Sequence, residues 1–157
     1  MKDLLVGLHR LNLDLKETKG DVKIVRLLSP NSDALVTFIE KNFSKGWASE
    51  IKAAIYKPHP TAFIAVKDGK IVGFAAYDAT AKGYFGPIGV DESLRGLNIG
   101  TALLVYSLEA MLHDGYGYAI IGGVNEKVAE FYKKTVGAIT IDMEGNVYDR
   151  LVRGLYL

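Results

Sequence analysis

The chain alternates short apolar runs with longer segments in which apolar residues recur every three or four positions. Short apolar runs are typical of strands in a buried sheet, and the recurring pattern is typical of helices that bury one face. Helices are expected at residues 29–43, 47–57, 97–114 and 126–135. Strands are expected at residues 22–28, 61–66, 70–77, 83–90, 118–122, 138–142 and 148–153. The first twenty residues fit both patterns and stay open between helix and strand.

The order of these segments predicts an α/β fold, with helices on both faces of a mixed, mostly antiparallel central sheet. The helix at residues 97–114 lies between two strands, and a helical crossover makes its flanking strands parallel. At 157 residues the chain is most simply one domain with a substantial core. We divide it into an N-terminal extension at residues 1–20 and a domain at residues 21–157. The leucines of the extension are expected to pack on this core or on a partner subunit, as in a homodimer.

Composition and charge argue against several classes of function. The formal net charge is +1, with both signs interspersed, so nucleic acid binding has little support. No signal peptide and no membrane-spanning apolar run are apparent, so we expect a cytoplasmic protein that does not bind a membrane. The absence of cysteine excludes disulfides, a thiolate nucleophile and cysteine-bound zinc. The three histidines are scattered without the spacing of metal ligands, so no metal site is expected.

The most informative segment is the glycine-punctuated turn that joins the strand ending at Val90 to the helix at residues 97–114. The first turn of a helix has free backbone N–H groups and the positive end of the helix dipole. Gly96 and Gly100 lack side chains that would keep phosphate groups from those amides, and Arg95 adds a cation. We interpret the turn as a pyrophosphate site; an ordinary glycine-rich turn before a helix is the alternative.

The turn resembles the signature of the GCN5-related N-acetyltransferases, the GNAT family. That signature is valine, four residues, arginine or glutamine, two residues, glycine, one residue, and glycine or alanine. Here Val90, Arg95 and Gly100 match it, and Asn98 stands where the first glycine is usual. Asparagine tolerates a left-handed backbone better than most residues. The resemblance implies an acyl-CoA N-acyltransferase-like fold, with acetyl-CoA as the cosubstrate.

The resemblance also implies where acetyl-CoA binds. Pro87 cannot donate to a sheet ladder, so the strand at residues 83–90 is expected to lose its partner locally, the alternative being a simple edge strand with a bulge. In the family, the pantetheine arm lies beside this strand, and an amide near Ile88 would polarise the thioester carbonyl. The cofactor-binding residues that the resemblance implies are Ile88, Gly89, Val90, Arg95, Gly96, Leu97, Asn98, Ile99, Gly100, Thr101, Asn125 and Tyr132.

The helix at residues 126–135 carries a second family-like element. Asn125 precedes the helix, and Tyr132 lies seven residues later, two turns along the same face. The resemblance implies that Asn125 binds the pantetheine arm and that Tyr132 protonates the departing CoA thiolate. The alternative is an amphipathic helix whose aromatic side chains pack on the sheet.

Without cysteine, direct attack of an amine on the thioester is favoured over an acyl-enzyme, and the amine must arrive neutral. Some family members carry a glutamate six residues before the motif valine; Tyr84 stands there, and Asp78 is the substitute base that we expect. The acceptor pocket is expected to be lined by the loop at residues 44–47, which includes Trp47, by Tyr77 and Tyr84, and by the turn near Asn146. We therefore predict an acetyl-CoA-dependent N-acetyltransferase that acts on a primary amine of a small molecule, an amino sugar being one candidate. The alternatives are a protein or peptide N-acetyltransferase and a non-catalytic CoA-binding module with the same fold.

Overall fold

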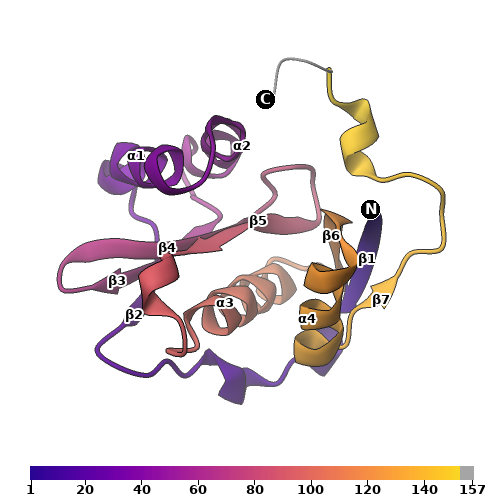
Figure 1. Cartoon of the computed structure of the whole chain (residues 1–157), viewed down its shortest axis with the longest axis horizontal. Coiled ribbons are helices and arrows are strands. Elements are labelled where there is room, and N and C mark those ends of the chain that lie inside the picture. The colour runs from indigo at the N-terminus through magenta and orange to yellow at the C-terminus, as the bar shows by residue number, and fades with distance from the viewer. Residues whose placement is uncertain (153–157) are drawn as a thin grey trace.

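The chain folds around one seven-stranded sheet with helices on both faces (Figure 1), in a computed structural model that describes residues 1–152. The strand order is β2-β3-β4-β5-β6-β1-β7, and every neighbouring pair is antiparallel except β5 and β6. The strands are β1 Lys2–Gly7, β2 Lys23–Arg26, β3 Ala62–Lys67, β4 Lys70–Tyr77, β5 Tyr84–Val90, β6 Tyr118–Val124 and β7 Ile139–Thr140. The predicted α/β fold with a mixed, mostly antiparallel sheet is confirmed.

Helices α1 and α2 cover one face of the sheet, and α3 and α4 cover the other (Figure 1). Their bounds are α1 Ser32–Asn42, α2 Lys45–Ile55, α3 Ile99–His113 and α4 Glu126–Val136. Side chains alternate along a strand, so Ile64 and Phe74 pack with α1 and α2, whereas Phe63 and Ala75 pack with α3. Because both faces are buried, these strands read as continuous apolar runs. Within residues 1–152, no helix is both long and apolar enough to cross a membrane.

The N-terminal segment contributes a strand to the sheet. Strand β1 lies between β6 and β7 and is antiparallel to both. Leu4 and Val6 are fully buried in the same core as the leucines of α3. A short 3₁₀ helix, Leu13–Lys16, then packs on α3, with Lys16 Nζ 2.7 Å from Glu109 Oε1. One hydrophobic core therefore spans the division that we expected near residue 20.

The end of the described chain differs from the prediction. Instead of the strand expected at residues 148–153, Val147–Arg150 forms a short 3₁₀ helix. Asn146 caps this helix: its Oδ1 accepts from the Tyr148 N–H at 2.9 Å, and its own N–H donates to Asp149 Oδ2 at 3.0 Å. A reciprocal cap of this kind favours a helical turn over a strand. Residue 153, the last of the expected strand, lies outside the described residues.

Candidate active site

Strands β5 and β6 separate after a short stretch of pairing and leave an opening in the sheet. They pair in parallel at Tyr84↔Ile120 and Phe85↔Ile121. Further along, β5 keeps only its antiparallel partner β4 within the described chain. The edge of β5 that faces β6 therefore has unpaired backbone groups around Pro87, where the sequence predicted a lost partner.

A cavity of about 420 Å³ occupies this opening. The two separated strands form its walls, and aromatic side chains reach it from α2, α4 and the C-terminal 3₁₀ helix. Of the expected site residues, Trp47, Ile88, Asn125 and Tyr132 come together here. Trp47 also packs on Phe43, with ring centroids 5.4 Å apart, so it belongs both to the core and to the cavity wall. The full lining is Met1, Trp47, Phe85, Gly86, Pro87, Ile88, Ile121, Gly122, Gly123, Val124, Asn125, Val128, Tyr132 and Tyr148.

Helix α4 presents Tyr132 to this cavity, and the residue that caps the helix, Asn125, lies there too. Tyr132 is buried, and its ring lies edge-on to Phe85 with centroids 6.3 Å apart. Burial raises the pKa of Tyr132 above the ordinary value of a phenol, and nearby Tyr148 raises that pKa further. Tyr132 therefore keeps its proton at neutral pH and can offer it to a group in the cavity. The Oδ1 of Asn125 accepts from the Val128 N–H at 2.9 Å, which leaves the Nδ2 group of Asn125 as a donor for a ligand.

The glycine-rich turn between β5 and α3 leaves the start of α3 open. Asn98 precedes the helix with a left-handed backbone, φ 62°, and its side chain does not cap the helix. Its Nδ2 donates instead to two backbone carbonyls of the N-terminal segment, Leu15 at 3.2 Å and Glu17 at 2.7 Å. Among the described residues, the first-turn amides of α3 therefore have no side-chain acceptor.

Space and charge at this turn suit an anion. A Cβ at Gly96 would meet no atom within 4 Å, and one at Gly100 would meet only the Val90 side chain, at 3.8 Å. Arg95 lies in the turn before α3, and 81% of its side chain is exposed. Its Nη2 lies 3.8 Å from Glu92 Oε1. An exposed ion pair of this length contributes little, so Arg95 is available to a ligand. We call residues 95–101 the anion cradle, because they combine open amides, the helix dipole and a cation.

Three of the expected cofactor residues have structural roles for their side-chain positions. A Cβ at Gly89 would lie 2.5 Å from the Phe43 ring, so this glycine of β5 makes room for the Phe43 ring to pack on the strand. The Ile99 side chain is buried in the core and the Leu97 side chain packs against it. The Leu97 carbonyl is also used, because it accepts from the Lys19 N–H at 2.9 Å. These residues offer a ligand their remaining backbone groups rather than their side chains.

The structure does not bring Tyr77, Asp78 or Tyr84 into the lining of this cavity. Because side chains alternate along β4, Tyr77 faces α3 rather than α2, and its hydroxyl donates to Asp114 Oδ2 at 2.5 Å. Both carboxylate oxygens of Asp78 accept from the Tyr116 hydroxyl at 2.9 Å, which holds Asp78 in the loop after β4. The Tyr84 ring packs against β6 beside the cavity wall.

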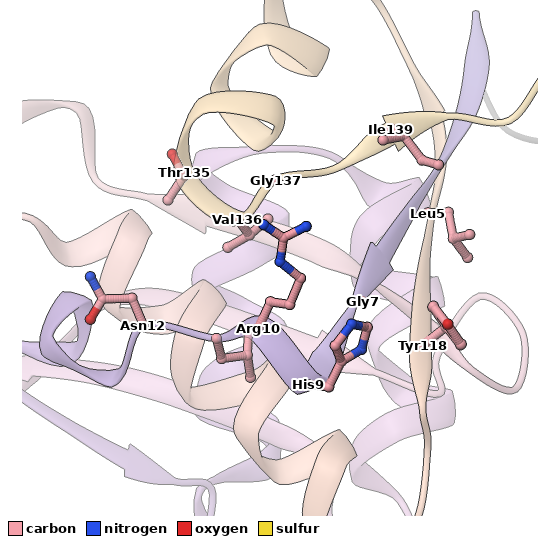
Figure 2. A pocket seen from close by; sticks show the side chains of 11 residues that line it. Leu5, Gly7, His9, Arg10, Asn12, Tyr118, Thr135, Val136, Gly137 and Ile139 are labelled. Atoms are coloured by element: carbon pink, nitrogen blue, oxygen red, sulfur yellow. The ribbon is translucent and has the colours of Figure 1, made fainter.

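A separate cavity of about 370 Å³ lies between the N-terminal segment and the end of α4 (Figure 2). Arg10 extends there toward Val136 and Gly137, and His9 lies beside it. The C-terminal end of a helix carries the negative end of its dipole, which favours a cation such as Arg10. This arrangement suits docking of the N-terminal segment onto α4, and no residue of the anion cradle lines this cavity.

Comparison with known proteins decides the family. A sequence model of the acetyltransferase (GNAT) family matches residues 29–138. The chain belongs to this family. The match spans helices α1 to α4 and the anion cradle, and the family expected from the motif is confirmed with it. Among curated proteins, none matches the chain.

Solved GNAT structures share the fold of this chain. The GCN5-related glucosamine N-acetyltransferase region of a fungal multi-domain GH3 β-N-acetylglucosaminidase gives a TM-score of 0.71 at 15% identity, over 89% of this chain and 19% of that one. A GCN5-related N-acetyltransferase from Sphaerobacter thermophilus gives a TM-score of 0.69 at 19% identity, over 89% of this chain and 48% of that one. A GNAT family acetyltransferase from Brucella melitensis was solved in complex with acetyl-CoA. It gives a TM-score of 0.51 at 19% identity, over 70% of this chain and 80% of that one. The chain thus spans less than half the length of the first two proteins, and the likeness supports the fold.

This GNAT chain also brings residues to the cavity from outside the family match. The sequence predicted the turn near Asn146 at the acceptor pocket, but it did not predict Tyr148, two residues later, or the role of Asp3. Tyr148 lines the cavity, and Gly123 of β6 makes room for its ring, because a Cβ there would collide with it. Asp3 of β1 fixes this contact: its Oδ1 accepts from the Gly123 N–H at 2.7 Å and its Oδ2 from the Val147 N–H at 3.2 Å. The adjacent glycines at 122 and 123 are the one signal in the sequence of so close an approach.

Proposed function

We propose that this GNAT chain transfers the acetyl group of acetyl-CoA to a primary amine of a small molecule, by direct attack on the thioester. The observation that carries the proposal is the cavity between β5 and β6, because it adjoins both an unpaired strand edge and the buried Tyr132. The anion cradle follows the end of the same strand β5. Family membership supports the donor chemistry.

The donor occupies the cradle and the strand edge. The pyrophosphate of acetyl-CoA binds the first-turn amides of α3, with Arg95 as its counter-charge. The pantetheine arm lies along β5, where the backbones of Ile88 and Val90 and the Nδ2 group of Asn125 bond to it. The unpaired edge of β5 and the complex of the Brucella protein with acetyl-CoA support this arrangement.

The reaction needs a neutral amine and a protonated leaving group. The amine nitrogen attacks the thioester carbonyl carbon and forms the C–N bond while an amide near Ile88 stabilises the developing oxyanion. The C–S bond then breaks, and the CoA sulfur leaves with the electron pair and takes the Tyr132 proton. A buried phenol is a weak acid beside a thiol of pKa about 8.5, so Tyr132 must act through its proximity.

The acceptor is a small amine, and an amino sugar is one candidate. Trp47 gives the cavity wall an aromatic ring of the kind that packs on a sugar face, and the fungal protein named above is a glucosamine N-acetyltransferase region. The positions of Tyr77 and Tyr84 do not support the acceptor-lining role expected for them, and that of Asp78 does not support its expected role as the base. A peptide acceptor and a non-catalytic CoA-binding module are the alternatives that the experiments below separate. The cytoplasmic location and a homodimer stay predictions.

Ligand-dependent melting tests the donor site. Acetyl-CoA at a hundredfold excess over its dissociation constant should stabilise the fold by about 2.7 kcal/mol. For a domain of this size that corresponds to a rise in Tm of about 5–11 °C. CoA should act similarly, whereas ATP should have a smaller effect. If neither CoA species shifts the melting temperature, the proposal is wrong.

Thiol release tests the transfer itself. The protein is mixed with acetyl-CoA and, in turn, glucosamine, agmatine, a peptide with a free N-terminus and a lysine-containing peptide. Faster release with a small amine than with either peptide supports the proposal, and the reverse order supports the peptide alternative. A protein that is stabilised by acetyl-CoA but releases no thiol with any amine is the non-catalytic module.

A further inference from the structure

Tyr148 stands between the cavity just described and a neighbouring one on the side of α2. We propose that the neighbouring cavity admits the acceptor as an ammonium ion and that Glu50, through the Tyr148 hydroxyl, accepts the proton that the amine must lose. The proposal rests on the proposed function and adds the residues that prepare the nucleophile. It also assigns the charge of the acceptor: a cation rather than a neutral or anionic molecule.

The placement of the two cavities carries the proposal. The neighbouring cavity has a volume of about 380 Å³. Among the described residues, Tyr148 is the one that lines both cavities. Trp47 and Glu50 lie one turn apart on α2, so the same helix supplies one side chain to each cavity. The lining of the neighbouring cavity is Ser49, Glu50, Ala53, Ala79, Thr80, Val147, Tyr148, Arg150 and Leu151.

The hydrogen bonds at Glu50 leave room for an ammonium group. The Tyr148 hydroxyl donates to Glu50 Oε2 at 3.3 Å, and the Thr80 hydroxyl donates to the same oxygen at 2.9 Å. Both donors use Oε2, so Oε1 remains for a donor on a ligand. The side chain of Glu50 is half-buried, which weakens solvent screening of its attraction for a cation.

The charges around the pair suit proton transfer. Burial raises the pKa of Glu50, and the hydrogen bonds from Thr80 and Tyr148 oppose this rise. Burial also raises the pKa of Tyr148 to about 12, with the Glu50 charge as the next cause. A carboxylate of raised pKa accepts a proton more readily, and a phenol of pKa about 12 stays protonated, so it can relay one. The other ionisable groups that face the pair are Arg150 in the cavity wall, Asp3 of β1 and Tyr132 of α4.

The proton balance closes without another reactant. The ammonium nitrogen gives a proton to the Tyr148 oxygen, while the Tyr148 proton moves to Glu50 Oε2. The ammonium becomes an amine and the carboxylate becomes a carboxylic acid. The amine then attacks acetyl-CoA as described above, and the CoA sulfur takes the Tyr132 proton. The second proton of the nitrogen replaces the one that Tyr132 gave, and Glu50 returns its proton to solvent. The net reaction is ammonium plus acetyl-CoA to acetamide plus CoA thiol and one proton.

The test compares three variants of the full chain with agmatine, a primary alkylamine, as acceptor. Glu50→Gln removes the proton acceptor with little change of shape, and Tyr148→Phe removes the relay but keeps the ring. Glu40→Gln makes the same chemical change as Glu50→Gln on an exposed position of α1. The measurements are kcat/KM for agmatine across pH 6–10 and the dissociation constant of acetyl-CoA for each variant.

We expect Glu50→Gln to lower kcat/KM at pH 7 by about 10²–10⁴-fold, the usual value of general base catalysis. The deficit should shrink toward pH 10, because free alkylamine accumulates near its pKa of about 10.4. Tyr148→Phe should show the same pH-dependent deficit. Acetyl-CoA affinity should not change in either variant, and Glu40→Gln should match the wild type throughout.

The loss of activity expected for Glu50→Gln cannot be attributed to a loss of folding stability. Burial raises the folded-state pKa of Glu50 above its unfolded value, so the stability that this shift contributes is present at low pH and lost as pH rises through the folded pKa. At neutral pH an ionised Glu50 therefore opposes folding, and Glu50→Gln should melt at the wild-type temperature or higher. A Glu50→Gln profile equal to that of Glu40→Gln, or a deficit that is constant across pH, would overturn the assignment of Glu50. If the wild type releases thiol with neither agmatine nor glucosamine, the proposed function fails and this inference fails with it.

Discussion

Replacing Leu4 by alanine tests whether the N-terminal strand belongs to the folded core. Leu4 is fully buried on β1, opposite Ile121 of β6 and Thr140 of β7. Its side chain packs in the core that includes α3. Because β1 is held by hydrogen bonds on both sides, the strand cannot move inward to fill the space that the substitution leaves.

The size of the effect follows from this burial. A fully buried Leu→Ala substitution costs about 2–5 kcal/mol, and the lost methyl groups account for only part of it, since a cavity remains. A domain of this size unfolds with about 5–15 kcal/mol in total, so the loss is a large fraction. At about 2–4 °C for each kcal/mol, Tm should fall by about 4–20 °C.

The assay is urea unfolding followed by circular dichroism, with a thermal melt beside it. The matched control is Leu13→Ala, which removes the same atoms from the same segment at a position that is 49% exposed. That variant should stay within about 0.5 kcal/mol of the wild type. If both variants unfold at the same urea concentration, β1 contributes nothing to the core and its placement between β6 and β7 is wrong.

Two further predictions address the candidate site. Gly100→Asp should abolish acetyl-CoA binding in a folded protein, because a carboxylate in the anion cradle repels pyrophosphate, whereas Gly100→Ala fits the free space and should keep binding. Calorimetric titration measures the two affinities and circular dichroism checks the fold; equal affinities would place the phosphates elsewhere. Tyr132→Phe should lower kcat by about 10²–10⁴-fold with little change in acetyl-CoA affinity, because it removes a proton but almost no surface; unchanged turnover would mean that Tyr132 only packs.

Local patterns predicted the elements whose partners are near in sequence. The turn residues Lys67, Asp68 and Gly69 predicted the hairpin of β3 and β4, and Gly96 and Gly100 marked the turn that precedes α3. Strand β1 could not be predicted because its leucines, with Leu8 and Leu11, fit a helix face. The strand-like alternation comes later, at Leu11, Leu13 and Leu15, where Leu13–Lys16 forms a 3₁₀ helix instead. The partner strands of β1 are β6 and β7, which lie more than a hundred residues away, and only pairing with them decides in favour of a strand.

The candidate site also contains residues that local sequence could predict and residues whose position depends on distant contacts. The cradle could be proposed from the glycines and the helix start within one motif, and the role of Tyr132 was implied by the resemblance of its helix to the family. Tyr77 and Asp78 were expected near the acceptor because they end β4, but the alternation of the strand and the Tyr116 hydrogen bond direct them elsewhere. Counting faces along β4 from the buried Phe74 would have separated Tyr77 from α2.

The remaining wall of the cavity depends on contacts that no local pattern can show. Asp3 bonds to Gly123, 120 residues away, and to Val147, 144 residues away. These two hydrogen bonds join the first strand, β6 and the C-terminal 3₁₀ helix, and so they set the position of Tyr148 between the two cavities. The family match ends at residue 138, before this segment. The part of the site that we assign to the acceptor therefore combines α2, within the family match, with the two ends of the described chain, while the part assigned to acetyl-CoA lies within the family match.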